Sequence, residues 1–221
     1  MRPRDPRRLL RQSRERTKAL ARVRILEQPV SEYAPDGSVR SRQVAELSLP
    51  RAELERVWNP EYLERLARTY WAYLTRTSLG LLRVLYTETA REVVLLRRPF
   101  VLLRFRAPKY ETKPTGGSVT WPIDRGILVA PGGRGKGFLR ITVERPDEDL
   151  GEEVTCRVSS EVSNFYPLLA GWGWFSKIGR LFYGQTQLRI HVLVTHGFLR
   201  SLARLELLPS VVGRLRRRIG G

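Results

Sequence analysis

The chain has 221 residues, 42% of them hydrophobic, which is enough to bury one sizeable core and predicts a single domain with tails. No run of about 18 uncharged apolar residues occurs, so the sequence predicts no membrane-spanning helix. The single cysteine, Cys156, excludes an intramolecular disulfide and is typical of a reducing compartment. The Arg-rich N-terminus is not followed by an apolar signal-peptide core, so we expect a cytoplasmic protein.

The formal net charge of +18 is concentrated at the two ends of the chain. Residues 1–24 carry ten Lys and Arg against two acids, and residues 211–221 carry four Arg, so these tails hold 12 of the 18 excess positive charges. The basic residues are 35 Arg and 5 Lys, and the planar fork of Arg suits phosphate or carboxylate. A coding bias toward Arg gives the same composition without any polyanionic partner.

The first predicted element is a basic helix over residues 6–26, which Asp5 caps and which carries only a thin apolar stripe. Residues 27–41 are rich in turn formers and predict a linker with a Pro-Asp-Gly turn. The expected domain organisation is a basic helix and linker over 1–41, one domain over 42–208, and a basic tail over 209–221.

The domain begins with a predicted strand over residues 42–49, and Pro50 then opens a short helix over 51–58. Asn59 and Pro60 are a cap and first-turn pair for the next helix. Its apolar residues recur at spacings of three and four, at Leu63, Leu66, Ala67, Tyr70, Trp71 and Leu74. This helix is expected to pack against a sheet.

From residue 79 the apolar period changes to that of strands. Six strands are predicted, over residues 81–87, 91–97, 100–107, 118–130, 137–145 and 152–164. The breaks between them are short, which favours an antiparallel meander. A long helix is predicted over residues 174–205, with a kink or break near Gly184 or Gly197.

This order of elements resembles that of the START-like superfamily, also called helix-grip or SRPBCC-type. The segment VAELSLPRAELERVW at residues 44–58 is similar to the usual entry of that fold, a strand that runs into a Pro-initiated helix with a Val-Trp pair. The resemblance implies an α+β, helix-grip fold, in which a seven-stranded curved antiparallel sheet surrounds a long C-terminal helix. It also implies a cavity between sheet and helix that binds apolar or amphipathic small molecules.

Two residues of the strand 118–130 are candidate ligand contacts in such a cavity. Alternation places Trp121 and Arg125 on one otherwise apolar face, which is expected to point inward. An inward Arg125 needs a carboxylate partner or an anionic ligand, such as the acid group of a lipid. Two alternatives remain: an internal Glu pairs with it, or a bulge at Gly126 turns it outward.

The strand 152–164 supplies two polar candidates. Alternation puts Ser160 and Asn164 on the same face as Val154, Val158 and Val162, in or at the mouth of the interior. These side chains suit the polar end of a ligand. The alternative is a hydrogen bond at the end of the strand that involves no ligand.

An aromatic loop over residues 165–183 supplies the last two candidates, Trp174 and Phe182. Aromatic residues with flanking cations are typical of a bilayer interface or of a mobile lid over a hydrophobic site. The alternative is that these rings close one end of the core.

Nothing in the sequence predicts catalysis. His191 and His196 are five residues apart, so they lie on different sides of a helix and do not form a zinc site, and a GxSxG elbow is absent. The glycine-rich run at 131–137 lacks P-loop spacing and predicts a hairpin loop. We expect no catalytic residue, metal or cofactor, and the sequence favours a binding protein over an enzyme.

The expected function is therefore binding of a small apolar or amphipathic, lipid-like molecule between the sheet and the C-terminal helix. The expected ligand contacts are Trp121, Arg125, Ser160, Asn164, Trp174 and Phe182. The alternative is that the Arg-rich tails and the aromatic loop bind nucleic acid or an anionic membrane surface, with the protein then peripheral at the membrane.

Overall fold

Within the residues that it describes, the computed structural model has ten strands and the two helices α2 and α3. It describes residues 21–26, 30–59, 61–87, 89–146, 151–166, 197–204 and 207–208. The strands are β1 (Arg22–Ile25), β2 (Val30–Tyr33), β3 (Val39–Pro50), β4 (Leu82–Tyr86), β5 (Ala90–Leu95), β6 (Val101–Arg106), β7 (Lys109–Lys113), β8 (Gly116–Arg125), β9 (Phe138–Glu144) and β10 (Glu153–Phe165). The helices are α2 (Arg51–Val57) and α3 (Tyr62–Thr77).

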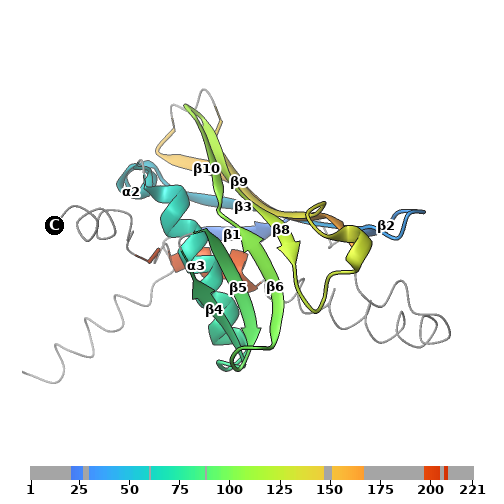
Figure 1. The fold of residues 1–221 in the computed structure, drawn as a ribbon. Helices are drawn as coiled ribbons and strands as arrows, with labels where there is room; N and C mark the ends of the chain where they lie inside the picture. The colour runs from blue at the N-terminus through green and yellow to red at the C-terminus, as the bar shows by residue number, and fades with distance from the viewer. Residues whose placement is uncertain are drawn as a thin grey trace, which may run out of the picture.

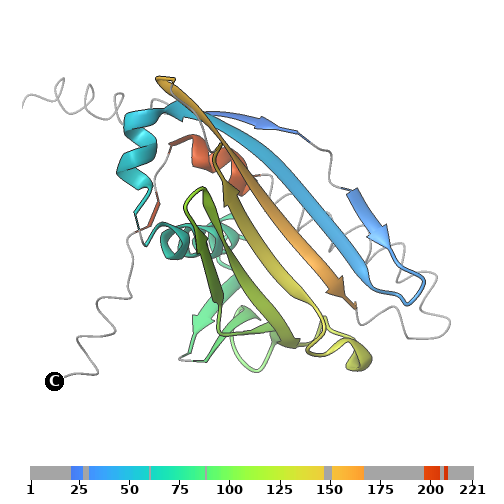
Figure 2. The ribbon, with the colours of Figure 1, turned by 90° about the horizontal axis from the view of Figure 1, so that it is seen from above.

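The strands form a single antiparallel sheet in the order β1-β3-β10-β9-β8-β6-β5-β4. Two further strands extend it, because β2 pairs with β3 and β7 pairs with β8. Figure 2 shows the long strands β3, β10, β9 and β8 side by side across the molecule. The predicted α+β class and antiparallel meander are confirmed, and each of the seven predicted strands is present. The predicted number of strands is wrong, since the sheet has ten.

The N-terminal part of the sheet corrects the prediction of a helix and a linker. Residues 22–25 form β1 because the sequence Arg-Val-Arg-Ile alternates with a period of two. The side chains of Val23 and Ile25 pack against the core, while Arg22 forms an ion pair with Glu153 at 2.6 Å. The structure of residues 6–20, the rest of the predicted helix, lies outside the described residues.

The predicted linker contains a hairpin, in which β2 and β3 flank the predicted turn at residues 35–37. The Oδ1 atom of Asp36 accepts a hydrogen bond from the backbone N–H of Ser38 at 2.9 Å, and Gly37 has a φ of 82°. This Asx arrangement fixes the turn. The sheet therefore begins at Arg22, before the domain boundary expected at residue 42.

The helices α2 and α3 confirm the predicted helical pair, but α3 begins at Tyr62 with Glu61 at its N-cap, two residues after the cap predicted at Asn59. Asn59 accepts a hydrogen bond from the backbone N–H of Glu61 at 3.1 Å, directly before α3. The buried side chains of α3 include Leu63, Leu66, Ala67, Tyr70 and Trp71, as their spacing predicts. They pack against the sheet, and we call the face of the sheet on which α3 packs the inner face (Figure 1).

Only the end of the long C-terminal helix predicted over 174–205 falls within the described residues. Residues 197–201 are helical and continue as a 3-10 turn at Leu202–Arg204. Phe198 is buried, with its ring centroid 5.2 Å from that of Tyr70 in an edge-on contact. This end of the chain therefore packs on α3. Among the described residues, no helix is both long and apolar enough to cross a bilayer.

Candidate functional site

The inner face of the sheet carries a polar patch between β3 and β10. Residues directly opposite one another in an antiparallel pair point to the same face, so the ladder register defines rows across the strands. One row consists of Gln43, Ser160, Ile141 and Val119, and the next of Ser41, Val162, Leu139 and Trp121. We call Ser41, Gln43 and Ser160 the inner polar patch.

The inner polar patch is almost completely shielded from solvent. Ser160 is 0% exposed, and Ser41 and Gln43 are each 1% exposed. The Oγ atoms of Ser41 and Ser160 have no hydrogen-bond partner among the described residues. A buried polar group without a partner costs about 1–3 kcal/mol, so the described part of the chain leaves two hydroxyls unsatisfied on neighbouring positions of one face.

The inward position of Ser160 agrees with the sequence prediction, whereas Ser41 and Gln43 were missed. Part of the signal was present, because residues 39, 41, 43, 45 and 47 of this long strand are buried, and the residues between them are exposed or half-buried except for Val44. The strand was predicted to begin at residue 42, which left Ser41 in the linker and cut this pattern.

Trp121 lies on the inner face, as predicted, and is 1% exposed. Its ring meets that of Trp71 on α3 edge-on, with centroids 5.2 Å apart and planes 75° apart. Trp71 in turn lies 5.3 Å from Phe105. Such aromatic pairs add about 0.5–1.5 kcal/mol beyond their burial, so this cluster fastens α3 to the sheet.

Arg125 does not point inward, which corrects the prediction. Phe105 pairs with Ile123, but its neighbour Arg104 pairs with Arg125, so β8 has one extra residue at Asp124. This bulge breaks the alternation and puts Arg125 on the same face as Arg104, opposite to the inner face. The alternative of a bulge that turns Arg125 outward is therefore the observed one, with the extra residue directly before Arg125.

The alternation rule also gave the wrong position for Asn164, which it predicted to lie on the inward face. The register between β10 and β3 shifts between Val162 and Phe165, and Asn164 has a φ of 51°. As a result Asn164 is exposed and Phe165 takes the inward position against Val39. Asn tolerates a left-handed backbone better than most residues, which explains its use at this bulge.

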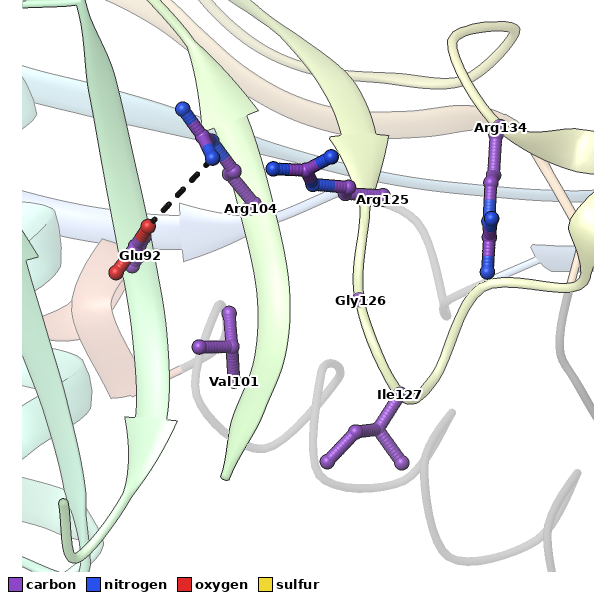
Figure 3. A pocket seen from close by; sticks show the side chains of 7 residues that line it. All are labelled: Glu92, Val101, Arg104, Arg125, Gly126, Ile127 and Arg134. Carbon is purple, nitrogen blue, oxygen red and sulfur yellow. Dashed lines mark ion pairs between the residues drawn. The ribbon is translucent and has the colours of Figure 1, made fainter. Parts of the chain in front are cut away.

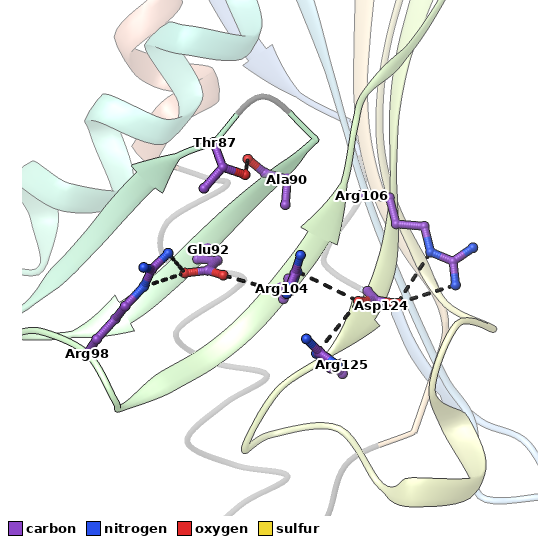
Figure 4. A network of polar contacts seen from close by, with 8 residues as sticks. All are labelled: Thr87, Ala90, Glu92, Arg98, Arg104, Arg106, Asp124 and Arg125. Carbon is purple, nitrogen blue, oxygen red and sulfur yellow. Dashed lines mark hydrogen bonds and ion pairs between the residues drawn. The ribbon is translucent and has the colours of Figure 1, made fainter.

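The outer face, opposite to α3, carries a chain of ion pairs across β5, β6 and β8 (Figure 4). The Nε and Nη2 atoms of Arg98 donate to the Oε2 atom of Glu92 at 2.9 and 2.6 Å. Asp124 lies 3.3 Å from Arg106 and 3.8 Å from both Arg104 and Arg125. Arg125 therefore belongs to an Arg-rich outer network that the sequence prediction did not foresee.

The carboxylate of Asp36, in the turn between β2 and β3, has a strongly lowered pKa. The hydroxyl of Tyr166 donates to the Oδ2 atom of Asp36 at 2.7 Å. This hydrogen bond, together with those from Ser38, lowers the pKa of Asp36 to about 2, and it raises the pKa of Tyr166. The contact ties the end of β10 to the turn between β2 and β3.

Several predicted functional residues lie outside the described residues. They are Trp174, Phe182, the basic tail over 209–221 and residues 1–20 of the basic N-terminal segment. Phe165 and Tyr166 are the described members of the aromatic loop, and both contact the sheet or its turns. Among the described residues, no group of three or more His, Cys, Asp or Glu side chains is placed to hold a metal ion.

Comparisons with known proteins give only distant similarity. No family model and no curated protein matches the chain. The crystal structure of CalU16 from Micromonospora echinospora is 9% identical, with a TM-score of 0.27, over 82% of this chain and 98% of that one. The human StarD13 (DLC2) lipid transfer and protein localization domain is 12% identical, with a TM-score of 0.24, over 95% of this chain and 100% of that one. At these TM-scores neither structure defines the fold of the chain.

Proposed function

We propose that the chain from Arg22 to Leu208 forms a START-like helix-grip domain, which places its start before the residue 42 expected from the sequence, because β1, β2 and all of β3 belong to the sheet. The support is the order of elements: β3 is followed by α2 and α3, and then by the antiparallel meander that returns to pair β10 with β3. Because residues 197–204 pack on α3, the predicted helix over 174–205 ends on the inner face.

The proposed function is non-enzymatic binding of a small amphipathic molecule against the inner face. The observation that carries it is the pair of buried hydroxyls, Ser41 and Ser160, without a partner among the described residues. A ligand's polar end supplies the missing hydrogen bonds, and its apolar part lies on the neighbouring side chains of the same rows, which include Ile141, Val162 and Leu139.

The polar end of this ligand is expected to be neutral. The cation predicted for the interior, Arg125, lies on the outer face. In the ladder, the described inward residues next to the patch include Val39, Ala45, Val158, Val162 and Ile141, and none of these is charged. Burying an anion without a cation costs far more free energy than burying a hydroxyl, an ester or an amide that forms a hydrogen bond with a serine.

The test is binding of two lipids with the same acyl chain, neutral monolaurin and anionic laurate, to the full chain by native mass spectrometry. We expect monolaurin to bind more tightly than laurate. The Ser160→Ala variant should bind monolaurin roughly tenfold more weakly, since one hydrogen bond in a dry site is lost. It is expected to fold, because the hydroxyl it removes has no partner among the described residues.

The matched control is Ser159→Ala, the same change one residue earlier on the opposite face of β10. It should leave monolaurin binding within twofold of the wild type. Equal binding of monolaurin by the wild type and Ser160→Ala, or a preference for laurate, would refute the proposal. So would the absence of any bound lipid.

A further inference from the structure

The outer face carries a concave site that is separate from the inner polar patch. A pocket of about 360 Å³ opens beside the end of β8, which is within the range that accepts a small molecule. Its charged lining consists of Arg104, Arg125, Arg134 and Glu92, and its apolar lining includes Val101 and Ile127. Figure 3 shows Arg104 and Arg125 on one side of this pocket and Arg134 across from them.

The backbone at Gly126 shapes this pocket. Gly126 has a φ of 152°, a backbone conformation that residues other than glycine rarely adopt. A Cβ atom at this position would also collide with the backbone carbonyl of Leu102. The glycine thus lets the chain turn sharply after the β8 bulge, with Arg125 before the turn and Ile127 after it.

The two carboxylates near the pocket are each shared by more than one arginine. Glu92 is 6% exposed, and its Oε2 atom receives both hydrogen bonds of Arg98, while its Oε1 atom lies 3.9 Å from Arg104. Asp124 is shared among Arg104, Arg106 and Arg125. The five guanidinium groups of this region, counting Arg134, exceed its two carboxylates.

The excess positive charge is directed at the pocket. Arg104 and Arg125 are directly opposite each other on adjacent strands, an arrangement in which like charges repel. Arg134 forms no ion pair with any residue in the described part of the chain, and it is exposed at the pocket's rim. An anion between these groups would relieve the repulsion, and each planar fork can bind an oxyanion through two hydrogen bonds.

We propose that this pocket binds a small organic oxyanion, a phosphate or a carboxylate, through Arg104, Arg125 and Arg134. The apolar portion of the ligand lies on Val101 and Ile127, and Ile127 is 47% exposed and open to such a contact. The ligand differs from that of the inner face in carrying a charge, and the site does not depend on the START-like assignment.

The experiment is isothermal titration of the full chain at constant ionic strength with inorganic phosphate, hexyl phosphate and hexanoate. We expect hexyl phosphate to bind at least tenfold more tightly than inorganic phosphate, because only the former covers Val101 and Ile127. Hexanoate distinguishes a carboxylate site from a phosphate site. If neither hexyl phosphate nor hexanoate binds, the proposal is overturned.

Variants assign the binding to the pocket. The double variant Arg125→Gln with Arg134→Gln should weaken hexyl phosphate binding by tenfold or more. The matched control is Arg42→Gln with Arg76→Gln, which removes two exposed charges on β3 and α3. Equal losses in the two double variants would show attraction to overall surface charge and overturn the proposal.

The apolar contact has its own test, Ile127→Ser. This variant should weaken hexyl phosphate binding and leave inorganic phosphate binding unchanged. Arg134 and Ile127 are exposed residues outside the strands, so the fold is expected to persist, and far-UV circular dichroism of each variant checks this. Loss of phosphate binding in a folded Ile127→Ser variant, or unchanged binding of hexyl phosphate, contradicts the assigned role of Ile127.

Discussion

The two faces of β8 differ in how completely their side chains are engaged by the protein itself. On the inner side, Trp121 and Ile123 are buried against α3 and the neighbouring strands. On the outer side, Arg125 is exposed and shares one carboxylate with two other arginines. One extra residue in the strand separates these environments, which shows that a single bulge can move a charge from the interior to a surface pocket.

Among substitutions on the two sides of β8, the largest loss of stability is expected on the inner side. Replacement of Trp121 by alanine should lower the free energy of unfolding by about 3–5 kcal/mol, because it removes the ring that contacts Trp71 and leaves a cavity. Urea denaturation measures the loss. Phe100→Ala, at a site 53% exposed, is the aromatic control and should cost less than about 1 kcal/mol. Similar losses in both variants would contradict a packed inner side.

The next largest effect is expected at the turn that follows the bulge. Gly126→Ala should lower the free energy of unfolding by about 1–3 kcal/mol, since alanine is strained at this φ and meets the carbonyl of Leu102. The control is Gly132→Ala, where an added Cβ has no neighbour within 4 Å. Thermal denaturation compares the two. A Gly126→Ala protein as stable as Gly132→Ala would mean that the turn is not fixed as described.

A smaller effect on stability, but a visible effect on binding, is expected on the outer side. Asp124→Asn removes the carboxylate that Arg104, Arg106 and Arg125 share. Exposed ion pairs contribute about 0–1 kcal/mol, so stability should change little. Binding of hexyl phosphate should strengthen a few fold, because the arginines lose their internal competitor. Weaker binding in this variant would contradict the proposed competition.

The smallest effect is expected just after the second bulge, at the end of β10. Here the hydroxyl of Tyr166 donates a hydrogen bond to Asp36. Tyr166→Phe should raise the pKa of Asp36 from about 2 toward its ordinary value of 3.8, as measured by NMR titration. A lowered pKa stabilises the fold above the unfolded-state pKa, and this contribution is lost as the pH falls from about 4 to about 2. An unchanged pKa of Asp36 in the variant would exclude this contact.

The sequence predicts those parts of the molecule in which a regular period persists. The helix α3 and the strand β9 have uninterrupted periods of 3.6 and 2, and β10 keeps its period of 2 before its bulge, so their buried faces follow directly from the spacing. The misplaced site residues, Arg125 and Asn164, lie at bulges, where one extra residue inverts the alternation. Such a bulge depends on pairing with a distant strand, so local spacing does not reveal it.

The outer pocket was missed for a related reason. Arg104, Arg125 and Arg134 come from a strand, a bulge and a hairpin loop, and only the ladder between β6 and β8 brings the first two together. Along the sequence each is one arginine among 35. The inner polar patch, by contrast, was partly found, because Ser160 precedes the bulge in β10 and keeps the regular alternation.

The central claim is that the two faces bind different ligands, a neutral amphipath inside and an oxyanion outside. Backbone amide chemical-shift mapping of the isotope-labelled full chain, titrated separately with monolaurin and hexyl phosphate, tests it most directly. We predict that monolaurin shifts the amides of Ser41, Gln43 and Ser160, and that hexyl phosphate shifts those of Arg104, Arg125 and Arg134. A single set of residues that responds to both ligands, or an inner polar patch that does not respond to monolaurin, would contradict the account.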